Sequence, residues 1–461
     1  MLWIFIPMYL GLTLAIGLWA SRRVRNVSDF TLAGRRLSTG FVGVTIFATW
    51  FGASQVMGNP GDFVQGGGSV LVTHVLGPVL CLLIVGFFYA RRLYRMQIIT
   101  VGDFFLQRYN KRLEVASSVL LVCTYFQWIA AQFVALAYLF QAVWGLSTPA
   151  GVLLGASIVV LYTYIGGMWA VSLTDMLQSV VILLGLVWLL GNVLVEAGGL
   201  GSVLAGQPEG FFRLVPETVE GWGTFVALLF AFVLGTIPVQ EVYQRIFSAW
   251  DERAAFRGSL WAAGLLLVLP AIPMVIGLVA LYLHPDLATV AGGQRLLPEM
   301  VMRYGSDPLQ VVFFGALISA ILSTSSGALL SPATLIGENL LGPYLGQVSD
   351  SRRLLWTRLS VLVVAAIAVF FALRDAHIVG LVVDSVSLAL VCLFAPFTLG
   401  LFWAKASTFG AWMAILLGGG VWIGTLIAGT SIDPIIYGTI VSCVAMVLGS
   451  WAKPDSPLRS G

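Results

Sequence analysis

The chain has 461 residues, of which 59% are hydrophobic and only 10% are charged, and its mean hydropathy is +0.96. Soluble domains carry about a quarter charged residues, so this chain has too few polar side chains to coat a water-soluble surface. The composition therefore predicts a protein that crosses the membrane several times, and it excludes a soluble enzyme and a disordered chain. A net charge of +3 gives no reason to expect a nucleic-acid partner.

Apolar runs of about 20 residues, the length of a transmembrane helix, recur along the chain. Strands of a transmembrane barrel are excluded because these runs are long and do not alternate apolar with polar residues. Arginines follow the first run and none precedes it, so we expect an uncleaved helix there rather than a signal peptide. The thirteen expected helices are 2–20, 39–66, 68–90, 114–145, 148–165, 168–195, 222–247, 259–283, 307–341, 354–373, 378–403, 406–428 and 432–451.

The basic residues predict how these helices are oriented. Thirteen helices place the two termini on opposite sides of the membrane, and all but four of the 24 Lys and Arg then fall on one side. Because basic residues accumulate in cytoplasmic loops, we expect a cytoplasmic C-terminus and an outside N-terminus in a plasma membrane, the inner membrane in a bacterium. The four exceptions are Arg213, Arg295, Arg303 and Arg374.

Two of the expected helices contain helix-breaking residues. The helix 39–66 includes Gly52 and Gly58-Asn59-Pro60-Gly61, and the helix 222–247 includes Gly235 and Pro238. Gly and Pro are common in membrane helices, so one such helix alone would carry little weight. Broken helices at corresponding places in two halves of a chain, however, point to the binding site of a transporter. These two lie five helices apart and so cross in opposite directions, as two inverted five-helix repeats require.

Four motifs follow one another along the chain. They are SDFTLAGRR at 28–36, TVGDFFLQRY at 100–109, YTYIGGMWAV at 162–171, and AILST at 320–324 with LSPAT after it. In this order they resemble the sodium/solute symporter family, and the likeness extends over nearly the whole chain.

The resemblance implies an all-α polytopic membrane protein with the leucine-transporter-type fold, which consists of two inverted repeats of five helices. A single transporter domain would then occupy residues 1–461. The extra N-terminal helix would be 2–20, the first repeat 39–195 and the second repeat 222–403. The two C-terminal helices would occupy 406–451.

Two adjacent hydroxyls, Ser323 and Thr324, lie in a helix rich in Ala, Ile and Leu. Na⁺ is a hard cation that prefers oxygen ligands, and hydroxyls and unwound carbonyls supply them inside a membrane. Such hydroxyls often only bond back to a carbonyl one turn earlier, so they would be structural without the motif. The resemblance implies that both belong to the family's sodium site. It also implies carbonyl ligands from Ala320 and, on the broken helix, from Ala48 and Phe51.

Acidic residues at membrane depth are costly and are functional by default. The resemblance places Asp175 on the path by which sodium leaves, and a salt bridge to a cytoplasmic arginine is the less favoured alternative. Glu241 and Arg245 lie four residues apart, a spacing that allows an ion pair on one helix face. We interpret that pair as structural or gating.

The solute is expected near the midplane, beside the two broken helices. The segments 48–50 and 235–238 resemble the choline-transporter branch, whose aromatic cage attracts a quaternary ammonium group. Trp50 and Trp128 fall at two cage positions, but Val239 stands where a further tryptophan is expected. The sequence therefore leaves two classes of solute open: an amino acid or other zwitterion, and a quaternary amine such as choline. The candidate contact residues are Trp50, Gln55, Asn59, Trp128, Gln132, Gln240 and Tyr243.

The sequence as a whole predicts a Na⁺-coupled symporter that imports a small organic solute by alternating access. We expect no cofactor beyond the coupling ion, no nucleic acid and no obligate protein partner, and H⁺ or Li⁺ coupling stays open. The alternative is a membrane sensor with the same fold, which would need a separate signalling partner because no signalling domain follows the last helix. The signs of a channel are missing. An enzyme is not expected, because the sequence shows no nucleophile–base pair and no metal-ligand cluster beyond the sodium site.

Overall fold

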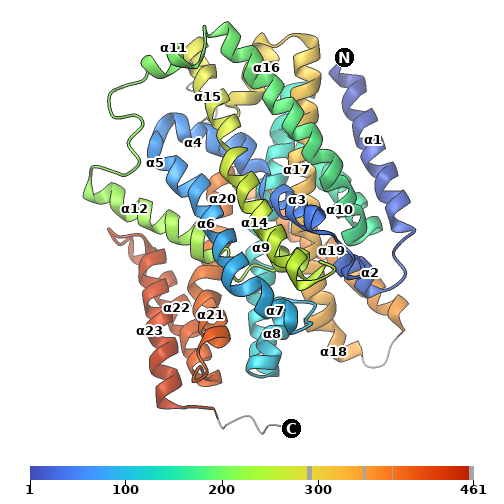
Figure 1. Ribbon diagram of the computed structural model, residues 1–461, viewed down its shortest axis with the longest axis vertical. Coiled ribbons are helices and arrows are strands. Elements are labelled where there is room, and N and C mark those ends of the chain that lie inside the picture. The colour runs from blue at the N-terminus through green and yellow to red at the C-terminus, as the bar shows by residue number, and fades with distance from the viewer. Residues whose placement is uncertain (288–292, 346–348, 376, 456–461) are drawn as a thin grey trace.

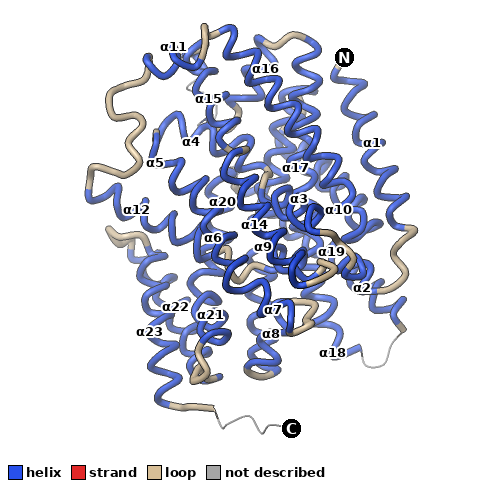
Figure 2. The backbone as a smooth tube through the Cα atoms, in the orientation of Figure 1, coloured by secondary structure: helices blue, strands red, loops and turns tan. Residues whose placement is uncertain are grey.

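The computed structural model is built of helices and describes residues 1–287, 293–345, 349–375 and 377–455 (Figure 2). In these ranges, the sole β-type pairing is an isolated bridge between Leu37 and Ala249. Eleven helices are long and apolar enough to cross a membrane, or up to twelve when the bent pair Thr39–Trp50 and Ser54–Gly66 counts as one span. The prediction of a polytopic helical protein is confirmed. The count of thirteen stays a prediction, since Thr148–Leu161 is a shorter apolar helix.

The helices pack around two central helices, and the first and last described helices lie at the periphery (Figure 1). In chain order they are α1 (Leu2–Ser21), α2 (Val27–Leu32), α3 (Thr39–Trp50), α4 (Asn59–Gly66), α5 (Gly68–Leu71), α6 (Gly77–Ile84), α7 (Arg91–Arg95), α8 (Val101–Arg108), α9 (Lys111–Trp144), α10 (Thr148–Glu196), α11 (Leu200–Ala205), α12 (Val219–Phe230), α13 (Gln240–Phe247), α14 (Glu252–Val268), α15 (Ala271–Leu283), α16 (Leu296–Tyr304), α17 (Asp307–Leu335), α18 (Gly342–Leu345), α19 (Asp350–Arg374), α20 (Ile378–Ala389), α21 (Ala395–Phe402), α22 (Thr408–Ala428) and α23 (Pro434–Ala452).

Short 3₁₀- and π-helical segments join several of these helices. π-helical turns are rare in proteins, but those that do occur often lie at functional sites. The 3₁₀ segment is η1 (Ala33–Arg35), and the π segments are η2 (Ser54–Gly58), η3 (Val72–Leu76), η4 (Val85–Ala90), η5 (Ala231–Gly235), η7 (Ile336–Leu341) and η8 (Leu390–Phe394).

The first predicted break lies between α3 and η2. Helix α3 ends at Trp50, and the chain bends by 57° before the helix resumes at Ser54. Phe51 has φ −90° and ψ 65°, which takes it out of the helical conformation. At Gly52 an added Cβ would overlap the side chain of Thr324 on α17, so only glycine allows this close approach. The break is therefore held against the central helix α17.

The second predicted break lies between η5 and α13. Pro238 has no backbone N–H and cannot continue the helix that ends in η5. The chain turns over Thr236–Val239, and α13 then begins at Gln240. A Cβ on Gly235 would overlap the backbone of Val386 in α20, so this break is also packed against a neighbouring helix. The structure thus confirms the interruption of both helices that the breakers indicated.

Helix α10 contains a kink between the predicted helices 148–165 and 168–195. Gly167 has φ +54°, a conformation that residues with a side chain rarely adopt, and an added Cβ would overlap Phe30 of α2. The backbone conformation at Gly167 and the close approach of α2 therefore explain why the second glycine of the GGMW motif has no side chain.

The central members are α9 and α17. In the most apolar part of α17, 89% of the residues are buried, against 28% for α1 and for α22. Helix α22 packs along α23 at one edge, and α1 lies at the opposite edge (Figure 1). Polar groups on α9 and α17 are thus shielded by protein on nearly every side.

Candidate functional site

The hydroxyls of Ser323 and Thr324 face the point where α3 ends. Ser323 Oγ lies 3.3 Å and Thr324 Oγ1 lies 3.0 Å from the carbonyl oxygen of Ala48. The last carbonyls of a helix have no intrahelical partner, and Thr324 Oγ1 donates to one of them while Ser323 Oγ lies nearby. The structure therefore brings together three of the five predicted sodium ligands. Their oxygens are the donor type that a hard cation prefers.

The other two predicted carbonyl ligands lie on the same two helices. Phe51 is the first residue of the unwound segment, and Ala320 precedes Thr324 by one turn of α17. Both are fully buried. They are thus near in sequence to the three converging groups.

Asp175 of α10 completes this cluster of oxygens. Its side chain is fully buried, and Oδ1 accepts a hydrogen bond from Ser323 Oγ at 2.5 Å. Within the described residues, Oδ2 has no hydrogen-bond donor. The Arg245 guanidinium acts on this carboxylate electrostatically. The acid expected on the sodium exit path therefore contacts one of the predicted sodium ligands directly.

Glu241 lies in the first turn of α13, directly after the second break. Its Oε1 is 3.4 Å from Trp50 Nε1, and its Oε2 accepts a hydrogen bond from the Tyr125 hydroxyl. The Glu241 backbone N–H also donates to that hydroxyl, at 2.9 Å. Arg245 Nη1 donates to the backbone carbonyl of Glu241 at 3.0 Å. The carboxylate thus joins α13 to α3 and α9, and the contact shown between Arg245 and Glu241 is to the backbone carbonyl of Glu241.

Three side chains on one face of α9 line up with the break in α3. Tyr125, Trp128 and Gln132 are spaced by three and four residues, which places them on the same side of a helix. Gln132 Oε1 accepts the backbone N–H of Ala53 at 2.9 Å, in the unwound segment. The indole N–H of Trp128 is buried and has no hydrogen-bond partner among the described residues. Of the predicted solute contacts, Gln132 therefore bonds the unwound segment after α3, and Trp50 contacts Glu241 at the start of α13.

The remaining predicted solute contacts divide into two groups. Asn59 Nδ2 donates to Gln55 Oε1 at 2.8 Å, so these two side chains pair beyond the break in α3. Gln240, by contrast, accepts the backbone N–H of Val101 at 2.7 Å. Tyr243 stacks on Phe247. The structure engages Gln240 and Tyr243 on other sides of α13 from Glu241, because successive residues of a helix project in different directions.

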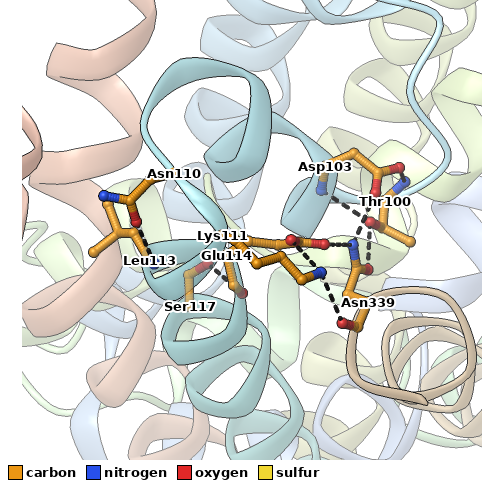
Figure 3. Close-up of polar contacts among 8 residues, drawn as sticks. All are labelled: Thr100, Asp103, Asn110, Lys111, Leu113, Glu114, Ser117 and Asn339. Atoms are coloured by element: carbon orange, nitrogen blue, oxygen red, sulfur yellow. Dashed lines mark hydrogen bonds and ion pairs between the residues drawn. The ribbon is translucent and has the colours of Figure 1, made fainter. Parts of the chain in front are cut away.

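A second polar cluster, the Asn339 cluster, joins η7 to the segment around α8 and α9 (Figure 3). Asn339 Nδ2 donates to Asp103 Oδ1 at 2.8 Å and to Glu114 Oε1 at 2.9 Å. Its Oδ1 accepts from Thr100 Oγ1 at 2.6 Å. Lys111 Nζ lies 2.5 Å from Glu114 Oε2, which gives that buried carboxylate a positive partner. One amide thus ties the end of the α17–η7 helix to the TVGDF motif, whose Val101 is bonded to Gln240.

We expect Asn339→Ala to loosen this junction. Losing the amide leaves the Asp103 and Glu114 carboxylates short of donors, at a cost of about 1–3 kcal/mol. Backbone hydrogen exchange of residues 99–114 should then become roughly 5- to 150-fold faster, as measured by mass spectrometry. The control is Asn192→Ala, which removes an exposed amide that bonds only Trp188 O within its own helix. Equal exchange in both variants would show that the cluster does not hold the junction.

The chain resembles known proteins in its sequence and in its structure. The family model described as "Sodium:solute symporter family" matches residues 30–418. The human high affinity choline transporter 1 is 28% identical over 425 residues, covering 87% of this chain and 72% of the relative. The sodium/pantothenate symporter of Haemophilus influenzae is 26% identical over 440 residues, covering 91% and 90%.

Two solved structures share the fold. A Na⁺-coupled sialic acid symporter in a substrate-bound outward-open state has a TM-score of 0.83 at 18% identity, with 99% of this chain and 98% of that chain covered. The nucleobase-cation-symport-1 family transporter Mhp1, in a closed conformation, has a TM-score of 0.62 at 16% identity, with 94% and 98% covered. The arrangement of helices is therefore that of known cation-coupled transporters.

Proposed function

The chain belongs to the sodium:solute symporter family, and we propose from this that it couples the entry of Na⁺ to the import of a small organic solute by alternating access. The observation that supports this best is the meeting of Ala48 O, Ser323 Oγ and Thr324 Oγ1 at the broken end of α3, with Asp175 beside them. Four groups whose oxygens suit a hard cation converge there at the most enclosed helix of the protein.

In this proposal Na⁺ binds to Ser323, Thr324 and the carbonyls of Ala48, Phe51 and Ala320. Asp175 receives the ion on its way to the cytoplasm. The solute binds on the other side of Trp50, between the breaks in α3 and α13. An occupied sodium site would then hold α3 against α17 and so shape the solute site, which couples the two.

The relatives leave the class of solute open. One is a transporter of choline, a cation, and another a symporter of pantothenate, an organic anion. We propose that the solute of this chain is an amino acid, another zwitterion or a quaternary amine, because Trp50 and Trp128 suit a positively charged group. The proposed location is the plasma membrane, with the N-terminus outside.

The test is uptake into liposomes that contain the purified protein. A panel of radiolabelled solutes, including choline, glycine betaine, proline and pantothenate, is offered with an inward Na⁺ gradient or with K⁺ in its place. We expect at least one solute to accumulate only with Na⁺, and counterflow to show exchange. Binding of a solute without uptake or counterflow would instead support a sensor, and would contradict the symporter.

A further inference from the structure

Three charged side chains are buried beside the broken ends of α3 and α13. Asp175, Glu241 and Arg245 are each at most 1% exposed. Arg245 acts electrostatically on both carboxylates. Charged groups at membrane depth are costly unless their charge is balanced. With both carboxylates ionised, one guanidinium leaves one negative charge to be balanced.

Na⁺ bound at the proposed site supplies the missing positive charge, and it does so next to Asp175 rather than next to Glu241. It lies at Asp175, which accepts the hydrogen bond from Ser323. With Na⁺ bound there, the two carboxylates, the guanidinium and the ion sum to zero. A solute that is neutral overall keeps that sum, whereas a bare cation or anion disturbs it. The charge balance therefore favours a solute without net charge, and a zwitterion meets this condition.

Glu241 is placed to meet the positive end of such a solute. It is held by Trp50 from α3 and by Tyr125 from α9, so its carboxylate lies between the two breaks. Trp128 lies one turn along α9 from Tyr125, with a buried indole N–H that has no hydrogen-bond partner in the described residues. A carboxylate with aromatic side chains around it suits an alkylated ammonium group, which is attracted both by the charge and by the ring faces.

We propose that Glu241 binds the positively charged nitrogen of a zwitterionic solute, an inference that rests on the symport proposed above. Trp50 and Tyr125 orient the carboxylate by donating to its two oxygens, and the acidic group of the solute keeps the buried charges balanced. Glu241 is then a residue that selects the solute.

A pair of molecules with the same shape and the same carboxylate isolates the contribution of the positively charged nitrogen to binding. Glycine betaine and tert-butylacetate differ only in the quaternary nitrogen, which is a carbon in the second. Their dissociation constants are measured on the full-length protein in Na⁺ buffer, from the rise in unfolding temperature with concentration. We expect wild type to bind betaine at least about 10-fold more tightly than tert-butylacetate, and choline more weakly than betaine.

In Glu241→Gln the preference for betaine over tert-butylacetate is expected to fall close to 1, because the ratio isolates the nitrogen–carboxylate interaction. Glu299→Gln makes the same change on α16, away from both breaks, and should keep the wild-type ratio. Stabilisation of Glu241→Gln by Na⁺ alone checks that the variant is folded. If it is not, Glu241→Asp retains the charge and is expected to keep a preference for betaine.

The inference is overturned if the ratio in Glu241→Gln equals that of wild type, if tert-butylacetate binds as tightly as betaine, or if choline binds more tightly. Absence of any Na⁺-dependent stabilisation by betaine at millimolar concentration overturns it too. Na⁺-driven uptake of an anionic solute such as pantothenate, unchanged in Glu241→Gln, would remove this role of Glu241 and leave the symport intact. No Na⁺-driven uptake of any solute would count against the symport itself.

Discussion

Replacing Ser323 and Thr324 together by alanine is expected to abolish the dependence of solute uptake on Na⁺. Both hydroxyls converge on the Ala48 carbonyl at the end of α3, and they are two of the five proposed ligands. A hydrogen bond or ligand contact to a charged group contributes about 1.5–3 kcal/mol. Losing two such contacts should weaken Na⁺ binding by roughly 10²- to 10⁴-fold. The Na⁺ concentration for half-maximal uptake then moves out of the measurable range.

The matched control for this double variant is Ser325→Ala. Ser325 is buried on the same helix, but its hydroxyl donates to Ile321 O one turn earlier. We expect its Na⁺ titration to coincide with that of wild type. Uptake by the Ser323/Thr324 variant that rises with Na⁺ as in wild type would show that the ion binds elsewhere.

Neutralising Asp175 should produce the second largest effect. In Asp175→Asn the side chain keeps its size but loses the negative charge next to Ser323. The attraction between unit charges a few ångströms apart in a protein amounts to several kcal/mol before desolvation is subtracted. We expect the half-maximal Na⁺ concentration to rise on the order of 10- to 100-fold. Measuring uptake at saturating solute against Na⁺ concentration gives this shift directly.

Asp384→Asn is the comparison for Asp175→Asn. Asp384 is an acid on another membrane helix, α20, but its carboxylate is exposed and bonds Gln127. Its removal should leave the Na⁺ titration unchanged. If both variants behave alike, the charge of Asp175 has no special relation to the ion.

Much of the fold could be predicted from the sequence, because each helix is encoded locally. Runs of apolar residues located the helices, and Pro238 and Gly52 lie at the two interruptions, whereas Gly58 and Gly61 lie in the helix that resumes after the first one. The hydroxyls of Ser323 and Thr324 could be singled out only through the motif, because Ser325, Ser326 and Ser331 lie on the same helix. The number of spans could not be predicted in the same way, since a kinked segment such as α10 forms one helix or two depending on the angle at the kink.

The contacts between distant segments could not be predicted. Asp175 meets Ser323 from a helix 148 positions away, and nothing local to either residue encodes that meeting. On α13, Gln240 and Tyr243 stay predicted solute contacts, whereas the contact between Glu241 and Trp50 follows from no local pattern. The direction of each side chain there depends on the angle at which the helix resumes after Pro238. That angle is set by packing against Val386 and other neighbours.

The claim that Na⁺ and solute move together is tested most directly by reversing the Na⁺ gradient. Liposomes containing the protein are loaded with the solute that the uptake panel identifies, at equal concentrations inside and outside, and the membrane potential is clamped. Coupled transport predicts net solute entry under an inward Na⁺ gradient and net exit under an outward gradient of the same size. Net solute movement that stays zero or keeps one direction under both gradients would contradict Na⁺-coupled symport.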